Sequence, residues 1–208
     1  MTGHDPTAVE LGAAPLGRAP FARWPEALRR RLLWISAGLS FVLMGVLTRI
    51  GVPLESEAAP RGIVSFELAG DASTAQVILD SWSDAARLHA ALGLGLDYLF
   101  LVAYAVALSL ACVEVAKRIA PVGLGTARVG VLLAWGQLLA GGLDAIENFA
   151  LIQLLLGSDC ASWPGLAWWC AAIKFGWVGA GLLYVIGGSI VVVVARRGRG
   201  AEGSPRRR

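Results

Sequence analysis

Four long runs of apolar residues dominate the chain, and charged residues, proline and glycine concentrate between them. The runs occupy about residues 32–52, 88–114, 129–156 and 168–195. Each is long enough, or nearly so, to cross a hydrocarbon core of about 30 Å as a helix that rises about 1.5 Å per residue. Buried helices of soluble proteins rarely repeat at this length four times with so few charges. The pattern therefore predicts an all-α protein, a four-helix transmembrane bundle.

The stretch between the first and second runs has a pattern of its own. Over GIVSFELAG (62–70) apolar and polar residues alternate, which predicts an extended segment with Ser65 and Glu67 on its polar side. Ser73 then begins a sequence typical of a capping box. We expect an amphipathic helix to follow on the outer membrane surface, either as a simple cover or as a ligand gate. Its apolar face consists of Ala75, Ile78, Leu79 and Trp82.

Composition supports the membrane prediction. Hydrophobic residues make up 56% of the 208 residues, charged residues only 16%, and the mean hydropathy is +0.64. The net charge of +3 does not indicate nucleic-acid binding, because the basic residues flank apolar runs, where they anchor membrane helices. We divide the chain into a basic tail with an interfacial segment (1–30), a four-span domain (31–197) and a basic tail (198–208). Residues 1–20 are expected to be disordered, and 21–31 to form a short interfacial helix.

The charges between the runs predict the orientation. The second linker carries Lys117, Arg118 and Arg128, whereas the third has Asp159 and neither lysine nor arginine. The first linker has two arginines and six acidic residues: Glu55, Glu57, Glu67, Asp71, Asp80 and Asp84. Cytoplasmic loops carry the excess of lysine and arginine, so both termini are expected in the cytoplasm. The predicted location is the plasma (inner) membrane, and no cleavable signal peptide is expected.

Four ionisable residues interrupt the apolar runs: Asp97, Asp144, Glu147 and Lys174. Each costs about 2.5–3.5 kcal/mol at a bilayer centre, so charges that remain there are usually paired, hydrated or functional. Helical rise places all four about 9–18 Å below the outer end of their runs, on three different helices. Overlapping depths on separate helices predict that they meet.

Helical spacing adds polar neighbours to this group. Gln137, Asp144 and Asn148 follow one stripe of the third run, and Tyr104 shares a face with Asp97. We expect a pocket in the outer half of the bundle, with Gln137 and Tyr104 as its floor. Arg49, at the end of the first run, could supply a second positive charge. Even then three acids face at most two cations, so a protonated carboxyl, a bound cation or water has to compensate.

The cysteines and histidines add little chemistry. Cys160 and Cys170 flank a short outer loop, where a structural disulfide is as well supported as two free thiols. Cys112 is expected to be a packing residue. The chain lacks the Cys-x-x-Cys pair of disulfide-generating membrane oxidoreductases. His89 has no zinc-ligand spacing to the carboxylates, so we expect no metal and no cofactor.

Several segments carry a resemblance to known proteins. GIVSFELAG (62–70), ILDSW (78–82), LDYLF (96–100) and LDAIEN (143–148) resemble a group of uncharacterised bacterial four-span integral membrane proteins. That resemblance spans residues 60–195 and implies the fold but no activity. At the level of fold alone, four spans with intramembrane acids are also similar to the sterol-isomerase and sigma-2-receptor group, whose residue pattern the chain does not match.

Three hypotheses for function follow. The leading one is a pocket for a small cationic or amphipathic ligand, in binding, transport or sensing, with Asp97, Asp144 and Glu147 as its anionic side and Lys174 and Asn148 orienting them. The second is a membrane enzyme that acts on a lipid by carboxylate acid–base chemistry. The third is a structural or assembly subunit whose polar cluster is a salt-bridge network. The expected partners are the bilayer, such a ligand and a homodimer partner, and not nucleic acid.

Overall fold

The computed structural model describes residues 16–121 and 123–202, with side chains through residue 194. Four long helices form the fold: α2 (Glu26–Gly51), α5 (Asp84–Ile119), α6 (Leu124–Leu155) and α7 (Ser162–Glu202). Short elements complete it: η1 (Leu16–Arg18), η2 (Val52–Leu54), α3 (Ile63–Glu67) and α4 (Ala72–Ser81). The predicted all-α bundle, with short helices between the first and second long ones, is confirmed. All four long helices are long and apolar enough to cross a membrane.

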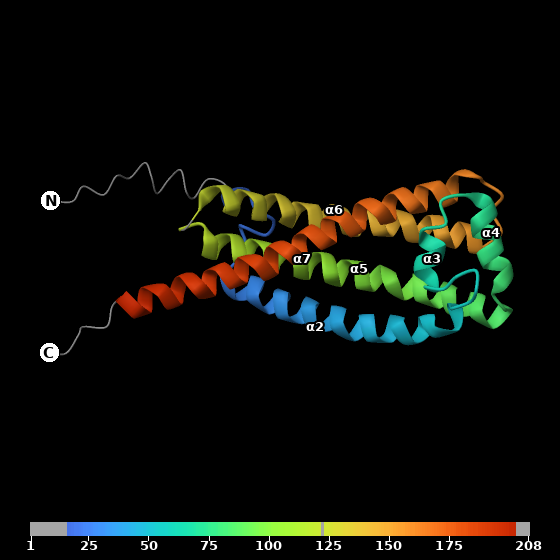
Figure 1. Cartoon of the computed structure of the whole chain (residues 1–208), viewed down its shortest axis with the longest axis horizontal. Coiled ribbons are helices and arrows are strands. Elements are labelled where there is room, and N and C mark those ends of the chain that lie inside the picture. Colours follow the sequence, from blue (N-terminus) through green and yellow to red (C-terminus); the bar gives the residue numbers. More distant parts are fainter. Residues whose placement is uncertain (1–15, 122, 203–208) are drawn as a thin grey trace.

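The long helices run side by side, and α5 lies at the centre of the packing (Figure 1). It packs against α2, α6 and α7, and α6 and α7 also pack against each other. Helix α2 packs chiefly along α5, and only 11% of its span is buried. The bundle therefore has two distinct ends. We call the end that carries α3 and α4 the capped end, and the end where α2 begins the terminal end.

Helix α4 covers the capped end with the apolar face expected from the sequence. Ala75, Ile78, Leu79 and Trp82 are all buried, and the Trp82 indole Nε1 donates a hydrogen bond to the Leu54 carbonyl at 2.8 Å. These side chains join one apolar cluster with residues of α3, α5, α6 and α7. The helix thus packs on the end of the bundle.

The start of α4 differs from the expected capping box. The N-cap is Asp71, whose carboxylate accepts a hydrogen bond from the Thr74 backbone N–H at 2.9 Å and is also bonded by the Ser73 and Thr74 hydroxyls. These hydrogen bonds lower the pKa of Asp71 to about 2. A carboxylate at the first turn also meets the positive end of the helix dipole, which makes aspartate a better cap here than serine.

Residues 62–70 are not extended, as the alternating pattern had suggested. Gly62 takes a backbone φ of +55°, a conformation that favours glycine, and the chain then turns into α3. Phe66 is 1% exposed and packs edge-on against the Trp82 ring, with 5.3 Å between centroids. The helical period of 3.6 residues directs Phe66 into the cap. It also places Ile63 and Glu67, which are four residues apart, together on a different face.

The N-terminal prediction also needs correction. No separate interfacial helix occupies 21–31 in the described chain: α2 begins at Glu26, directly after Pro25, and continues into the span. Proline suits this position because it lacks the N–H that a first turn leaves unbonded. Residues 16–24 instead fold onto the bundle, where Ala19 is buried and the Trp135 indole donates to the Arg18 carbonyl at 3.0 Å. The predicted disordered tail lies outside the described residues up to position 15, and the predicted basic tail does so from 203.

Candidate functional site

The structure brings the four predicted ionisable residues into one cluster in the capped half. Asp97 comes from α5, Asp144 and Glu147 from α6, and Lys174 from α7. Asp97, Asp144 and Lys174 lie eleven to thirteen residues from the capped-end termini of their helices. At about 1.5 Å per residue this corresponds to depths of about 16–20 Å. Asp144, Glu147 and Lys174 are buried, and Asp97 is half-buried.

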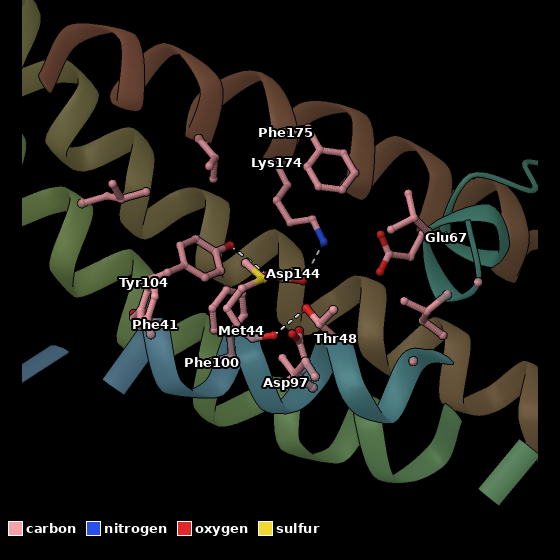
Figure 2. A pocket seen from close by; sticks show the side chains of 18 of the residues that line it. Phe41, Met44, Thr48, Glu67, Asp97, Phe100, Tyr104, Asp144, Lys174 and Phe175 are labelled. Atoms are coloured by element: carbon pink, nitrogen blue, oxygen red, sulfur yellow. Dashed lines mark hydrogen bonds and ion pairs between the residues drawn. The ribbon is translucent and has the colours of Figure 1, made fainter. Parts of the chain in front are cut away.

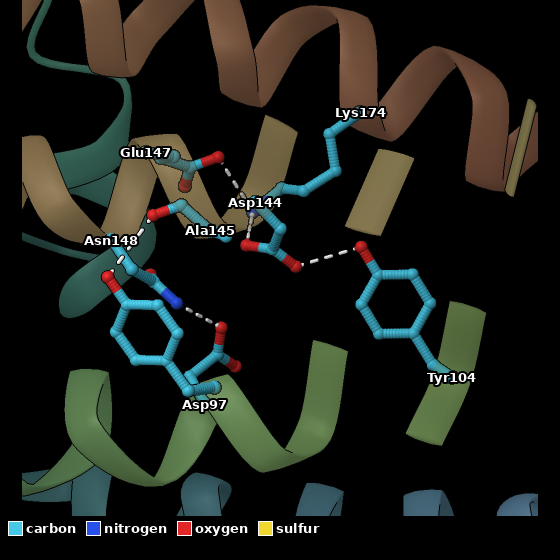
Figure 3. A network of polar contacts seen from close by, with 8 residues as sticks. Asp97, Tyr104, Asp144, Ala145, Glu147, Asn148 and Lys174 are labelled. Carbon is cyan, nitrogen blue, oxygen red and sulfur yellow. Dashed lines mark hydrogen bonds and ion pairs between the residues drawn. The ribbon is translucent and has the colours of Figure 1, made fainter. Parts of the chain in front are cut away.

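Lys174 is the hub of this cluster (Figure 3). Its Nζ donates a hydrogen bond to Asp144 Oδ1 at 2.8 Å and lies 2.8 Å from Glu147 Oε2. The Tyr104 hydroxyl donates to the other oxygen of Asp144, Oδ2, at 2.8 Å. Both oxygens of Asp144 are therefore engaged by protein groups. Neither oxygen of Glu147 accepts an oriented hydrogen bond from the described residues, so its link to Lys174 is an ion pair alone.

Asn148 and Asp97 form a second pair, between α6 and α5. The Asn148 amide Nδ2 donates to Asp97 Oδ2 at 2.7 Å, and Asn148 is only 2% exposed. Next to this pair the Tyr98 hydroxyl donates to the Ala145 carbonyl at 3.2 Å, a further link between the same helices. Only Oδ2 of Asp97 has a hydrogen-bond partner among the described residues, which leaves Oδ1 as a free acceptor.

One member of the site, Glu67, is not among the site residues predicted from the sequence. Its position in the first linker groups it with the outer-loop acids, but α3 directs its side chain into the cluster from the capped end (Figure 2). Its Oε2 is buried without a hydrogen-bond partner in the described chain, and its carboxyl interacts with that of Glu147. Burial raises the pKa of Glu67 to about 7; Lys174 opposes the shift, and Asp144 and Asp97 add to it. Helical spacing was the available signal, since Ile63 and Glu67 share one face.

Two predicted members lie elsewhere. Gln137 is buried nearer the terminal end and does not form the pocket floor, because its amide donates to the Trp177 carbonyl at 2.8 Å and joins α6 to α7. Arg49 is exposed on α2 and does not line the pocket. The exposed arginine that does line its mouth is Arg61.

A pocket of about 750 Å³ extends from the charged cluster between α2 and α7 (Figure 2). Asp97, Glu67, Asp144 and Lys174 line its polar end. The remaining walls are mostly apolar and include Phe41, Met44, Leu47, Phe100, Phe175 and Leu182. Because α2 packs along α5, the space between α2 and α7 opens sideways, and Phe41 at this edge is 83% exposed. The pocket therefore has an amphipathic lining.

The charges at the polar end do not balance. Four carboxyls (Glu67, Asp97, Asp144 and Glu147) surround a single buried lysine among the residues that the structure describes. Unpaired carboxylates are costly in a low-dielectric site, so protons or a bound cation must compensate. Adding Glu67 makes the excess of acid larger than the sequence had indicated.

The cysteines and His89 lie outside this cluster. Cys160 is exposed, Cys170 is buried, and both are free thiols. Cys160 precedes α7, whereas Cys170 lies eight residues beyond Ser162, about 12 Å along the helix, which is too far for a disulfide. Within the described residues no group of three histidine, cysteine or acidic side chains is arranged to hold a metal. His89 lines a small cavity beside the pocket.

No protein-family model, no curated protein and no solved structure matches this chain. The resemblance to four-span bacterial proteins therefore stays a prediction. What the pocket can do chemically follows from its own residues.

Proposed function

We propose that the protein binds an amphipathic cation, with the cationic head at the acidic end of the pocket and the apolar chain between α2 and α7. The observation that carries this proposal is the pairing of an apolar, sideways-open pocket with an end where carboxyls outnumber lysine. A volume of about 750 Å³ lies within the range of small-molecule pockets, roughly 300–1,000 Å³.

The free carboxyl oxygens indicate where the head would bind. Asp144 is engaged by Lys174 and Tyr104, so it is poorly placed to take a further cation. The Asp97 and Glu67 side chains line the pocket, and within the described chain Asp97 Oδ1 has no hydrogen-bond partner and the Glu67 carboxyl has no cation within ion-pair distance. We therefore assign cation recognition to Asp97 and Glu67. Asp144 holds Lys174 and Tyr104 in place, and Asn148 orients Asp97.

The opening of the pocket suggests the route of entry. It lies between two membrane-length helices and is edged by exposed apolar side chains such as Phe41 and Met44. In a bilayer this surface would contact lipid, so an amphiphile could move sideways from the membrane without crossing water. The ligand class that fits is a single-chain amphiphile with an amine or quaternary ammonium head.

The proposal includes an orientation. The capped end carries most of the acidic loop residues and the terminal end carries Lys117, Arg118 and Arg128, so the capped end would face outward from the plasma membrane, with both termini cytoplasmic. Cys160 is exposed at the capped end. In cells it should react with a membrane-impermeant maleimide without permeabilisation, and a Cys160→Ser variant should lose that labelling. Labelling only after permeabilisation would reverse the orientation.

Ligand-induced thermal stabilisation tests the binding. Decyltrimethylammonium, decyl sulfate and decanol share an alkyl chain and differ in head charge. We expect only the cation to raise the Tm of the detergent-purified protein, because a ligand that binds the folded state at 100 times its Kd adds about 2.7 kcal/mol. Equal stabilisation by all three would contradict the proposal.

Variants of that experiment locate the head. Asp97→Asn and Glu67→Gln should each weaken stabilisation by the cation, since each removes a carboxylate from the wall of the pocket. The matched control is Glu57→Gln, which neutralises an exposed acid that does not line the pocket and should leave stabilisation unchanged.

One observation favours a second candidate, a membrane enzyme that acts on a lipid. Glu67 and Glu147 are adjacent carboxyls, and such a pair can divide the roles of general acid and base. Mass spectrometry of membrane lipids should then show a species that changes with the wild-type protein but not with Glu67→Gln or Glu147→Gln. An unchanged lipid profile would leave binding as the function.

A further inference from the structure

A second, smaller cavity of about 70 Å³ adjoins the pocket between α2 and α5. It shares Glu67 and Asp97 with the main pocket, and it adds His89, Gly93 and Asn148. A cavity holds a water molecule when it offers roughly 10–15 Å³ of such volume and two to four polar partners. With two carboxyls, an amide and an imidazole in its walls, this cavity has room and partners for several waters.

His89 connects the small cavity to the surface. It lies five residues after the start of α5, is partly exposed, and its Nδ1 is 2.7 Å from the Ala85 carbonyl. The other ring nitrogen, Nε2, has no protein partner in the described chain and can bond water. Imidazole can take up and release protons, so His89 is suited to pass them between solvent and the cavity.

The charge balance requires protons at this site when no cation is bound. Three more carboxyls than ammonium groups face each other there, and desolvation disfavours that many ionised carboxylates. A cation that enters the pocket supplies the missing positive charge, and a carboxyl proton then becomes superfluous. Binding and deprotonation are therefore coupled through the same carboxyls.

We propose that the site exchanges a proton for its cation, and that the proton travels through the small cavity past His89. This inference rests on the proposed function. In the exchange the carboxylic acid of Glu67 loses its proton to cavity water, its carboxylate pairs with the incoming ammonium, and one proton reaches the solvent at the capped end. No other bond forms or breaks, and the net charge of the site is the same before and after.

Glu67 is the group best placed for this exchange because it lines both cavities. Burial raises its pKa to about 7, so the carboxyl holds a proton near neutral pH until a cation arrives. Helix α2 contributes uncharged residues to this part of both cavities. The ionisable groups that face Glu67 from the other elements are Asp97, Tyr104 and His89 on α5, Asp144 and Glu147 on α6, Lys174 on α7, and Glu55 and Arg61 at the mouth.

Proton release on binding tests the exchange. Decyltrimethylammonium is the probe because its quaternary nitrogen carries no proton, so any proton released comes from the protein. In weakly buffered solution at about pH 6.5, a pH dye should report up to one proton per cation bound for wild type and for Glu57→Gln. Glu67→Gln should bind the cation more weakly and release several-fold fewer protons per cation bound, because an amide has no proton to exchange.

Gly93→Leu tests the route. A Cβ at Gly93 would meet Ile50 Cγ2 at 3.6 Å, an ordinary contact, so this position admits a side chain, and a leucine there would occupy the small cavity that Gly93 lines. Stopped-flow release should slow by about tenfold or more, because bridging water is displaced, while the number of protons released stays the same. His89→Ala should also slow it. Gly95→Leu is the control, since no atom lies within 4 Å of its Cβ position.

The outcomes separate the two proposals. If the cation does not bind wild type, the proposed function fails. If it binds without releasing protons, binding stands and the exchange is wrong. If protons are released at an unchanged rate in both Gly93→Leu and His89→Ala, the exchange stands and its route is wrong.

Discussion

In the terminal half of the bundle α5, α6 and α7 meet through small and apolar side chains, whereas in the capped half the same helices bury carboxyls and a lysine beside their apolar contacts. Glycines make the first kind of contact possible. A Cβ at Gly136 would overlap the Trp177 ring, and one at Gly181 would overlap the Gln137 amide. In the capped half α2 and α7 instead stand apart and leave a pocket. The helices of the terminal half are closely packed, whereas those of the capped half leave a pocket beside charged side chains.

The difference separates the half that stabilises the fold from the half that contains the proposed ligand site. Small residues let membrane helices approach closely, and the resulting van der Waals packing between the helices stabilises the bundle in lipid. Buried ion pairs seldom repay the cost of desolvating both charges. A fold that needed only stability would have no use for four carboxyls around one lysine. The capped half is therefore the part of the molecule in which function is the better explanation.

The largest expected effect comes from Lys174→Met. Removing the only buried cation of the described cluster leaves Asp144 and Glu147 without a counter-charge, which typically costs about 3–5 kcal/mol. The free energy of unfolding, measured by titration with dodecyl sulfate in mixed micelles, should fall by that amount. Lys117→Met, at the terminal end of α5, should change little. Equal losses of unfolding free energy in the two variants would mean that the charged cluster depends on its lysine no more than a helix end does.

A triple variant separates structure from function in the same cluster. Lys174→Met together with Asp144→Asn and Glu147→Gln removes both charges of each pair, so most of the lost stability should return. If the cluster were only a salt-bridge network, this variant would behave as wild type in every assay. We expect it to fold and yet to bind decyltrimethylammonium with a Kd that differs from that of wild type, because it has lost two of the four carboxyls and the lysine beside them.

The next prediction concerns the terminal half. Gly136→Ala should cost about 1–3 kcal/mol, because its methyl group has no room beside Trp177 and the ring must move. Gly142→Ala, on the same helix with nothing within 4 Å, should be neutral or stabilising by up to about 1 kcal/mol. Circular dichroism melting curves of the two variants would measure the difference. Similar melting curves would show that close packing at Gly136 does not stabilise the terminal half.

How much could be predicted from the sequence differs between these halves. Apolar runs of membrane length define the four helices almost by themselves, because the bilayer fixes the length a span must have. Asp97, Asp144, Glu147 and Lys174 stand out because charge is rare in such runs. Their common depth follows from helical rise, and the structure brings all four together.

The rest of the site depends on packing that no local pattern records. Glu67 lies in a short segment where alternating and helical spacing are both compatible with the residues, and only burial of Phe66 against Trp82 favours the helix. Gln137 lies on the predicted stripe, but it bonds the backbone of α7 instead of facing the pocket. The separation of α2 from α7, which creates the pocket, is a tertiary property.

The smallest expected effect is the pH dependence contributed by Glu67. Its ordinary pKa is 4.5 and burial raises it to about 7 in the folded protein, so between these values the folded state holds more protons than the unfolded state. Stability therefore falls as pH rises from about 4.5 and the loss is complete somewhat above pH 7. Because the side chain is only partly buried, we expect a loss on the order of 1 kcal/mol. Glu67→Gln stays neutral at every pH, so its Tm should decline less than that of wild type between pH 5 and 8, whereas Glu57→Gln should follow wild type. Parallel profiles for all three proteins would show that α3 does not bury an ionisable group in the site, and the contrast between the two halves would then rest on Lys174 and its partners alone.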